Sequence, residues 1–373
     1  MDRIDCLVSG AGVVGLAVAR ALAMAGHSVV VLDPADVIGS GASSRNSEVV
    51  HAGLYYTPGS LKASLCTGGR ELLLGYCAAH GIPWRRIGKL VVAAGEADRP
   101  ALEAIEARAL ACGVTSLQRL TGSEARALEP ALTCHAALWS PETAIVDTHA
   151  LMAALRRDAE LGGAAIVLRT ALSSAQRIGD AWRVTTTEAD GFRIDARWII
   201  NCAGLDAQAV ARRLDGFPGT HIPPLHVAKG NYFALDGAVP FAHLVYPVPF
   251  DGGLGIHLTL DMAGQARFGP DVEWLPDGAP RTLTVDPARA TAFTREVQRY
   301  WPGLPDDALR PAYAGFRAKL SARGAPAADF RIDGPRSHGV RGVVHCFGIE
   351  SPGLTASLAI GAHVTALVQS AGH

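Results

Sequence analysis

The chain has 373 residues, 49% hydrophobic and 18% charged, so it is long enough for two globular domains and too apolar for a disordered chain. Its 34 Lys and Arg residues are balanced by 35 Asp and Glu residues, which excludes a global field that attracts nucleic acid or an anionic membrane. The seven scattered cysteines form no C-x-x-C pair, which argues against a disulfide framework or a metal site and fits a reducing cytoplasm.

The first expected elements are a short buried strand at residues 4–9, a glycine-rich turn and an apolar helix that reaches Ala25. A second strand, residues 28–32, ends at Asp33. We do not interpret this apolar run as a signal peptide, because no basic segment precedes it, Arg20 interrupts it and glycines break it. No other stretch is long and apolar enough to span a membrane, so membrane contact is expected to be peripheral at most.

The turn has the pattern G-x-G-x-x-G, in which each glycine has a mechanical task. Gly10 permits the tight turn, Gly12 lets the backbone approach a pyrophosphate, and Gly15 lets helix and strand pack closely. The helix N-terminus favours the negative phosphates, and Asp33 is placed to accept a hydrogen bond from a ribose hydroxyl. This context predicts a Rossmann-type dinucleotide site. The residues expected to face the dinucleotide are Gly10, Gly12, Val13, Val14, Gly15 and Asp33.

Two later segments are expected to return to this first domain, after a run of strands between residues 164 and 187. The first is a buried strand at 197–202 with a small-residue turn at Ala203 and Gly204; the second is a strand at 343–348 with a turn at 351–355 and an apolar helix that ends near Ser370. Nicotinamide domains are usually contiguous, whereas this interleaving is typical of flavoproteins whose C-terminus closes over the flavin. The pattern therefore predicts FAD, and no second G-x-G-x-x-G is present for NAD.

The remaining chain forms two blocks that interrupt the flavin domain. The predicted FAD-binding domain comprises residues 1–82, 142–206 and 333–373, and the substrate domain comprises residues 83–141 and 207–332. The substrate domain carries expected strands at 227–235 and 255–260 and a helix at 287–300. We expect an α/β protein, with a Rossmann-type FAD-binding domain and an interleaved second domain built on a mixed, largely antiparallel sheet. The substrate pocket is expected between them.

The stretch from Arg45 to Ala63 closely resembles a motif of L-2-hydroxyglutarate dehydrogenases and oxidases, within the D-amino-acid-oxidase-like group of FAD enzymes. Shorter resemblances extend over almost the whole chain, at residues 88–90, 143–147, 246–249, 255–257, 269–270 and 315–318. The resemblance implies FAD, oxidation of (S)-2-hydroxyglutarate to 2-oxoglutarate, and a mixed sheet over the flavin. The chain departs from the family pattern at Glu48, where Gly is common, at 229–232, where Arg-Gly-Asp-Tyr is usual, and at 348–352.

Oxidation of a 2-hydroxy acid needs a base beside the substrate hydroxyl while hydride passes to flavin N5. His51 is our candidate, because an imidazole with a pKa near ~6.5 is ready to accept a proton at cytosolic pH. The alternative role of His51 is to pack against or hydrogen-bond the flavin. His257 is the rival base, or a ligand of a substrate carboxylate.

Charged carboxylates in a desolvated pocket need charged or multiple neutral donors. Arg317 is the expected anchor, because its planar fork suits a carboxylate and it lies in an apolar, strand-like run at 312–320. A structural ion pair is its alternative. Lys229 and Tyr246 are candidates for the second carboxylate or the hydroxyl, or for structural roles. We assign Lys62 and Lys89 to solvated faces.

Further cofactor contacts are expected from a loop after the glycine-rich residues 39–42 and from the closing helix. The loop hydroxyls and amide suit FAD phosphates or ribitol, although ordinary turn chemistry is the alternative. The helix N–H groups suit negative charge on the reduced flavin. The residues are Ser43, Ser44, Asn46, Ser47, Gly348, Gly353, Leu354 and Thr355. A covalent link to the flavin stays open.

The leading hypothesis is FAD-dependent oxidation of a small (S)-2-hydroxy acid, with 2-hydroxyglutarate as the best candidate. The alternative on the same scaffold is oxidation of amino acids or secondary amines, and a lesser one is a flavin-binding protein without catalysis. Expected partners are a small-molecule carboxylate and an electron acceptor, which is oxygen, a quinone or an electron-transfer protein.

Overall fold

The computed structural model describes residues 3–188, 191–248 and 255–370, so Pro249 of one resembling motif lies outside the described residues. The nucleotide-binding start of the chain forms as expected. Strand β1 (Arg3–Ser9) is followed by helix α1 (Val13–Met24) and strand β2 (Val29–Leu32), and β1 and β2 pair in parallel. Cys6, Leu7 and Val8 of β1 are fully buried, which explains why this short run reads as a core strand.

An eight-stranded sheet surrounds β1 in the described part of the chain. Its order is β10-β11-β12-β1-β2-β9, and β20, paired with β19, joins the end of β12. The added strands are β9 (Ala165–Val167), β10 (Leu172–Ile178), β11 (Ala181–Thr186), β12 (Arg193–Asn201), β19 (Arg331–Asp333) and β20 (Val343–Phe347). The late strands β12 and β20 thus return to the first domain, as the interleaved pattern predicts.

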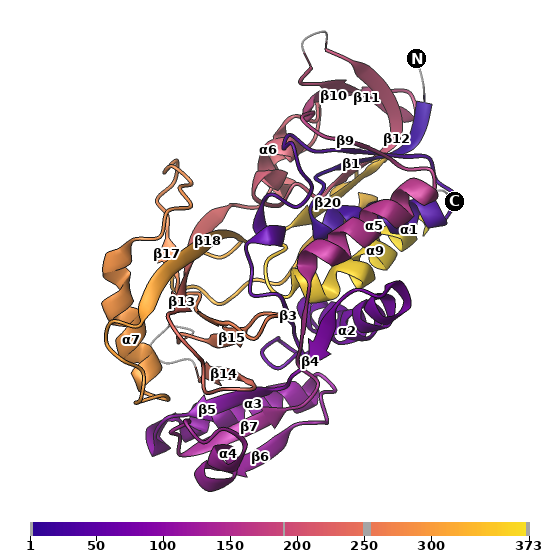
Figure 1. Cartoon of the computed structure of the whole chain (residues 1–373). Coiled ribbons are helices and arrows are strands. Elements are labelled where there is room, and N and C mark those ends of the chain that lie inside the picture. The colour runs from indigo at the N-terminus through magenta and orange to yellow at the C-terminus, as the bar shows by residue number, and fades with distance from the viewer. Residues whose placement is uncertain (1–2, 189–190, 249–254, 371–373) are drawn as a thin grey trace.

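Three helices lie together against this sheet: α1, α5 (Thr148–Leu161) and the C-terminal α9 (Gly353–Ser370). Figure 1 shows α9, in yellow, alongside α1, in indigo. The two helices approach closely at Gly361, where an added Cβ would lie 2.7 Å from the Ala17 carbonyl oxygen. Among the described helices, none is long and apolar enough to cross a membrane.

The second sheet has nine strands in the described residues and is mostly antiparallel. Its order is β17-β13-β16-β15-β14-β5-β7-β6, with β18 beside β13; β5 and β14 are its one parallel pair. This arrangement confirms the expected fold class. The strands are β5 (Lys89–Ala93), β6 (Gln118–Thr121), β7 (Ala136–Ser140), β13 (His226–Leu235), β14 (Leu244–Pro247), β15 (Leu258–Leu260), β16 (Ala266–Phe268), β17 (Glu273–Trp274) and β18 (Leu309–Lys319). The remaining helices are α2 (Leu61–His80), α3 (Arg99–Ala111), α4 (Gly122–Leu128), α6 (Ala207–Arg212), α7 (Ala290–Gln298) and α8 (Pro335–His338).

A small third sheet joins chain segments from both proposed domains. It pairs β3 (Val49–Val50), β8 (Ala144–Val146) and β4 (Trp84–Arg86). The division into two domains remains a proposal, which the two large sheets follow closely. Strand β19 crosses the proposed boundary at residue 333, because it pairs with β20 of the first sheet.

Two predicted elements are shorter than expected. The strand predicted at 255–260 is β15, and it begins at Leu258 because Gly255 has a φ of 68°, a turn conformation that a strand cannot continue through. The helix predicted at 287–300 is a 3-10 turn, Pro287–Arg289, followed by α7.

Two adjacent glycines of α2 are expected to respond oppositely to alanine. Gly68 is exposed and an added Cβ meets no atom within 4 Å, so Gly68→Ala should stabilise the protein by about 1 kcal/mol through helix propensity. Gly69 is buried, and its added Cβ would lie 2.7 Å from the Thr355 carbonyl oxygen of α9. Gly69→Ala should therefore destabilise the protein by about 1–3 kcal/mol. Denaturant unfolding measures both; equal effects would contradict the close α2–α9 packing.

Candidate active site

The glycine turn leaves no room for side chains at two of its positions. Gly10 has a φ of 108°, and a Cβ there would lie 2.5 Å from the Cys202 carbonyl oxygen at the end of β12. A Cβ on Gly15 would lie 1.9 Å from the Gly10 carbonyl oxygen. The turn thus packs directly against the segment that carries Ala203, whose N–H donates to Asn201 Oδ1 at 3.2 Å, and Gly204, which has a φ of 57°.

The N-terminus of α1 fits a dinucleotide phosphate. The helix has no side-chain N-cap and no acidic residue in its first turn, and the N–H of Val13 donates to Ser43 Oγ at 2.9 Å. Asp33 accepts from the N–H groups of Ala11 at 2.7 Å and Ala35 at 2.9 Å. Each carboxylate oxygen retains a second lone pair, which suits a ribose hydroxyl. The structure therefore brings Gly12, Ser43 and Asp33 to one place.

Side chains of the loop after Ser43 form hydrogen bonds with the backbone of the same loop. Asn46 donates to the Ser43 carbonyl at 2.6 Å and accepts from the Glu48 N–H at 2.7 Å, and Ser47 Oγ lies 3.0 Å from the Tyr232 hydroxyl. The Ser44 hydroxyl is 3.5 Å from the Gly41 carbonyl oxygen. Glu48 has a φ of 56°, a left-handed conformation, which explains why Gly is common at this position in the resembling family.

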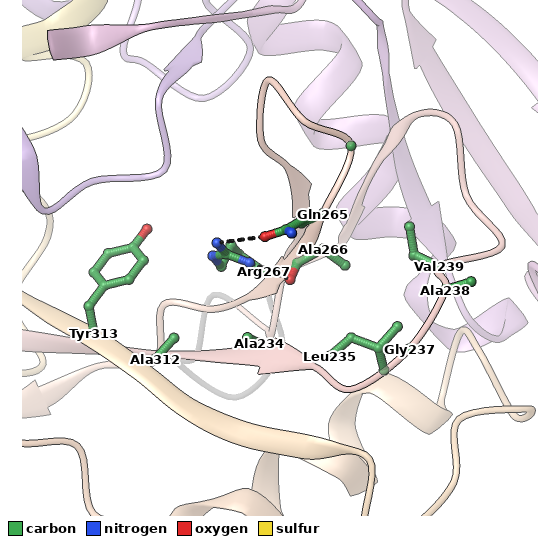
Figure 2. Close-up of a pocket in the computed structure, with 11 residues that line it drawn as sticks. Ala234, Leu235, Gly237, Ala238, Val239, Gln265, Ala266, Arg267, Ala312 and Tyr313 are labelled. Carbon is green, nitrogen blue, oxygen red and sulfur yellow. Dashed lines mark hydrogen bonds between the residues drawn. The ribbon is translucent and has the colours of Figure 1, made fainter.

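One hollow adjoins this loop, and a second one adjoins the first. One of about 170 Å³ is lined partly by Ser44, Asn46 and Ser47, and it shares Arg267 and Tyr313 with a larger one of about 670 Å³. Figure 2 shows the larger hollow, with Arg267 beside Gln265 and facing Tyr313. His51 and Arg317 do not line either of these hollows, so we place the chemistry at the side-chain cluster described next and not in the larger cavity.

The start of α9 is tied to His51. Thr355 Oγ1 accepts the His51 N–H at 3.0 Å and donates to the Val49 carbonyl at 3.4 Å. The N–H groups of Leu354 and Thr355 have no backbone acceptor among the described residues. Gly348 has a φ of 66°, and an added Cβ on Gly353 would lie 2.8 Å from Ile349 Cγ2. The closing turn is therefore tight, and it presents free N–H groups beside His51.

The His51 imidazole is held neutral. Burial lowers its pKa to about 3, and the positive charges of Lys89 and Arg317 contribute. Its Nε2 lies 3.3 Å from Ser351 Oγ, while its buried Nδ1 has no hydrogen-bond partner among the described residues. A neutral imidazole with one ring nitrogen unpaired is chemically suited to accept a proton.

Arg317 lies on β18 and makes no hydrogen bond or ion pair with any described residue. Its positive charge is one of the causes that lower the pKa of His51. Tyr246 is buried, which raises the pKa of its hydroxyl, and its ring stacks on His257 with centroids 3.6 Å apart. The structure thus gathers His51, Tyr246, His257 and Arg317, all of which are sequence-predicted.

Lys229 lies apart from this cluster, which favours the structural role that the sequence leaves open for it. On the β13–β18 pair Lys229 is opposite Phe316, whereas Arg317 is opposite Ala228, so Lys229 and Arg317 point to opposite faces of the sheet. Its Nζ donates to the Thr284 carbonyl at 2.6 Å and lies 4.0 Å from Glu273. These contacts are those expected of a structural lysine.

The prediction that Lys62 and Lys89 lie on solvated faces is wrong. Lys62 is 8% exposed and pairs with Glu350 at 3.1 Å, and Lys89 is fully buried within the cluster around His51. A signal was present for Lys89, since it opens the apolar run Lys89–Ala93, in which every residue proves to be buried.

The glycine turn before α1 suits a dinucleotide phosphate. The C-terminal helix α9 returns to His51, whose imidazole is neutral, and Arg317 forms no ion pair with a described residue. These features define the class of the protein as an oxidoreductase that binds a dinucleotide. A family model described as FAD dependent oxidoreductase matches residues 5–367, and the chain belongs to this family. FAD is therefore its cofactor, as the interleaved strands predict.

Comparison with individual proteins shows which members of the family the chain resembles. The chain is 43% identical to the mitochondrial L-2-hydroxyglutarate dehydrogenase of Arabidopsis thaliana, over 97% of this chain and 83% of the relative. It is 27% identical to the L-2-hydroxyglutarate dehydrogenase of Escherichia coli K12, over 98% and 93%. Its fold matches the FAD-bound L-alpha-glycerophosphate oxidase of Mycoplasma pneumoniae with a TM-score of 0.89 at 24% identity, over 99% of this chain and 95% of that one. These matches confirm the resemblance seen in the motifs.

Proposed function

We propose that the chain oxidises (S)-2-hydroxyglutarate to 2-oxoglutarate. The observation that carries this proposal is the neutral buried imidazole of His51, whose pKa is lowered in part by the charge of Arg317, a guanidinium that forms no ion pair with a described residue. A 2-hydroxy acid needs a carboxylate anchor and a proton acceptor next to each other, and this pair supplies both. The 43% identical relative carries the name of a dehydrogenase for this substrate, which supports the choice.

Bound FAD supplies the centre that accepts hydride from the hydroxyl-bearing carbon. Arg317 binds and orients the adjacent carboxylate through its planar fork. His51 accepts the hydroxyl proton, and its unpaired Nδ1 is the atom free to do so. The anionic carboxylate offsets the Arg317 charge that disfavours protonation of His51, so substrate binding raises the proton affinity of the imidazole when the proton arrives.

The residues proposed to hold FAD lie along the path from the glycine turn to the start of α9. The start of helix α1 and Asp33 would hold the pyrophosphate and a ribose, the loop after Ser43 would contact the middle of the cofactor, and the N–H groups of Leu354 and Thr355 would donate to the flavin. We keep Gly10, Gly12, Val13, Val14, Gly15, Asp33, Ser43, Ser44, Asn46, Ser47, Ala203, Gly204, Gly348, Gly353, Leu354 and Thr355 as the proposed set.

The proposed setting is the cytoplasm, and the seven free thiols support a reducing compartment. The proposed electron acceptor is oxygen, a quinone or an electron-transfer protein. Stopped-flow reoxidation of the reduced enzyme with each of them in turn distinguishes the three.

Anaerobic mixing of the holoenzyme with (S)-2-hydroxyglutarate should bleach the visible absorbance of oxidised flavin, whereas glycine and L-proline should leave it unchanged. The reason is that the amines lack the hydroxyl proton for His51. Bleaching by an amine and not by the hydroxy acid would assign the chain to amine oxidation. A holoenzyme that no such substrate reduces would be a flavin-binding protein without this catalysis.

A further inference from the structure

Lys89 is a buried lysine with no hydrogen-bond partner. It opens β5 and lies in the sheet between Leu244 of β14 and Ser140 of β7. Its side chain is fully buried, and its Nζ makes no hydrogen bond with a described residue. A buried ammonium without a counter-ion is costly, so a fold retains one where a ligand supplies the missing charge.

Two aromatic rings flank the Lys89 ammonium. Its Nζ lies 4.9 Å from the centre of the Tyr55 ring and 4.7 Å from that of Tyr246. The faces of two aromatic rings favour a cation and also pack well against methylene groups. The titratable groups that interact with Lys89 are Tyr55, Cys66, Tyr246 and His51.

None of these groups neutralises Lys89. Burial raises the pKa of the Cys66 thiol to about 12 and that of both tyrosines above its usual value, so all three stay uncharged. The carboxylate of Glu350 is paired with Lys62 at 3.1 Å and with Lys319 at 2.9 Å, and the charge of Arg317 also acts on it. Lys89 forms no ion pair with a described residue, and Lys89 and Arg317 both act on His51.

We propose that the Lys89 ammonium binds the second, distal carboxylate of the substrate, and so makes the site selective for 2-hydroxy dicarboxylates. Arg317 holds the carboxylate beside the reacting carbon, the rings of Tyr55 and Tyr246 pack against the methylene chain, and Lys89 meets its charged end. This inference rests on the proposed function. Each of the two carboxylates of the substrate would meet one cation, Arg317 at one end and Lys89 at the other.

The charge on Lys89 also predicts a pH dependence. Burial lowers its pKa to about 7, so the ammonium is present below that pH and is lost above it. Because kcat/KM reports the free enzyme, its value for the dicarboxylate should fall about tenfold per pH unit above the Lys89 pKa. Lys89→Arg keeps the charge and should remove this alkaline decline.

The test compares (S)-2-hydroxyglutarate with (S)-2-hydroxypentanoate, which has a methyl group in place of the distal carboxylate. Lys89→Met should raise KM for the dicarboxylate about 100-fold with kcat nearly unchanged, and should leave the monocarboxylate unaffected or improved. The dissociation constant of 2-oxoglutarate, measured by calorimetry, should rise by a similar factor. Arg317→Lys is the contrasting variant, because it should weaken binding of both substrates.

Bound-flavin absorbance reports whether Lys89→Met is folded, and Lys89→Gln is the second variant if it is not. An equal loss of kcat for both substrates, with 2-oxoglutarate binding unchanged, would overturn the proposal and make Lys89 a proton-transfer group. Binding of 2-oxoglutarate needs no turnover. A wild-type holoenzyme that 2-hydroxyglutarate fails to reduce would thus count against the proposed function, while an unchanged dissociation constant in Lys89→Met would count against this inference.

Discussion

Replacing His51 by Gln should slow flavin reduction by saturating (S)-2-hydroxyglutarate about 10²- to 10⁴-fold, the usual contribution of a general base. Gln fills similar space and retains a hydrogen-bonding group for Ser351, but it cannot accept a proton at neutral pH. FAD should remain bound, because the His51 N–H bond to Thr355 is made by the backbone. Anaerobic stopped-flow absorbance measures the reduction rate directly.

The pH profile of wild-type reduction offers a second readout for His51. Burial, with Lys89 and Arg317, lowers its pKa to about 3, so the imidazole is already deprotonated at mildly acidic pH. Protonation of the base removes activity only below its own pKa. The acid limb of kcat/KM is therefore expected well below the ordinary imidazole value of ~6.5.

His363→Gln is the matched control for His51→Gln. This half-buried histidine lies on α9, ten positions after the helix begins, and burial also lowers its pKa. The reduction rate of the control should equal that of wild type. If His51→Gln also retained the wild-type rate, His51 would have only the alternative role of packing against the flavin.

The Rossmann-type start of the fold was predictable because its signals are local. Gly10, Gly12 and Gly15 stand between an apolar strand and an apolar helix, and each spacing has one mechanical explanation that the added-Cβ distances bear out for Gly10 and Gly15. The returning strands β12 and β20 were equally predictable, because each is a short apolar run in the sequence. The start of helix α9 was predictable from the turn that precedes it.

The charged residues of the site were harder to predict, because their surroundings depend on strand register. Lys229 and Arg317 both lie on long strands, and only the pairing of β13 with β18 shows that they face opposite sides. Lys89 opens an apolar run, but its complete burial becomes evident only when β5 is placed between β7 and β14. Long-range pairing of this kind leaves little trace in a single sequence.

Gly15→Ala should weaken FAD binding by about 100-fold. The added Cβ would lie 1.9 Å from the Gly10 carbonyl oxygen, a backbone atom that cannot rotate away, so the turn must open where α1 begins. Overpacking of this kind commonly costs about 1–3 kcal/mol, and a cost of 3 kcal/mol borne by the holo form alone weakens binding by about 100-fold. The purified variant should lose its visible flavin absorbance, and titration of the apoprotein with FAD measures the loss.

Gly75→Ala on α2 is the control, because Gly75 is exposed and an added Cβ there meets nothing within 4 Å. It should bind FAD as wild type does. Thermal unfolding of both apoproteins separates a local defect from misfolding, since the clash of the added Cβ with the Gly10 carbonyl oxygen concerns the turn and leaves the nine-stranded sheet intact. If Gly15→Ala took up FAD with wild-type affinity, the α1 start would not hold the dinucleotide. The roles assigned to His51, Arg317 and Lys89 would then lack the cofactor toward which they are arranged.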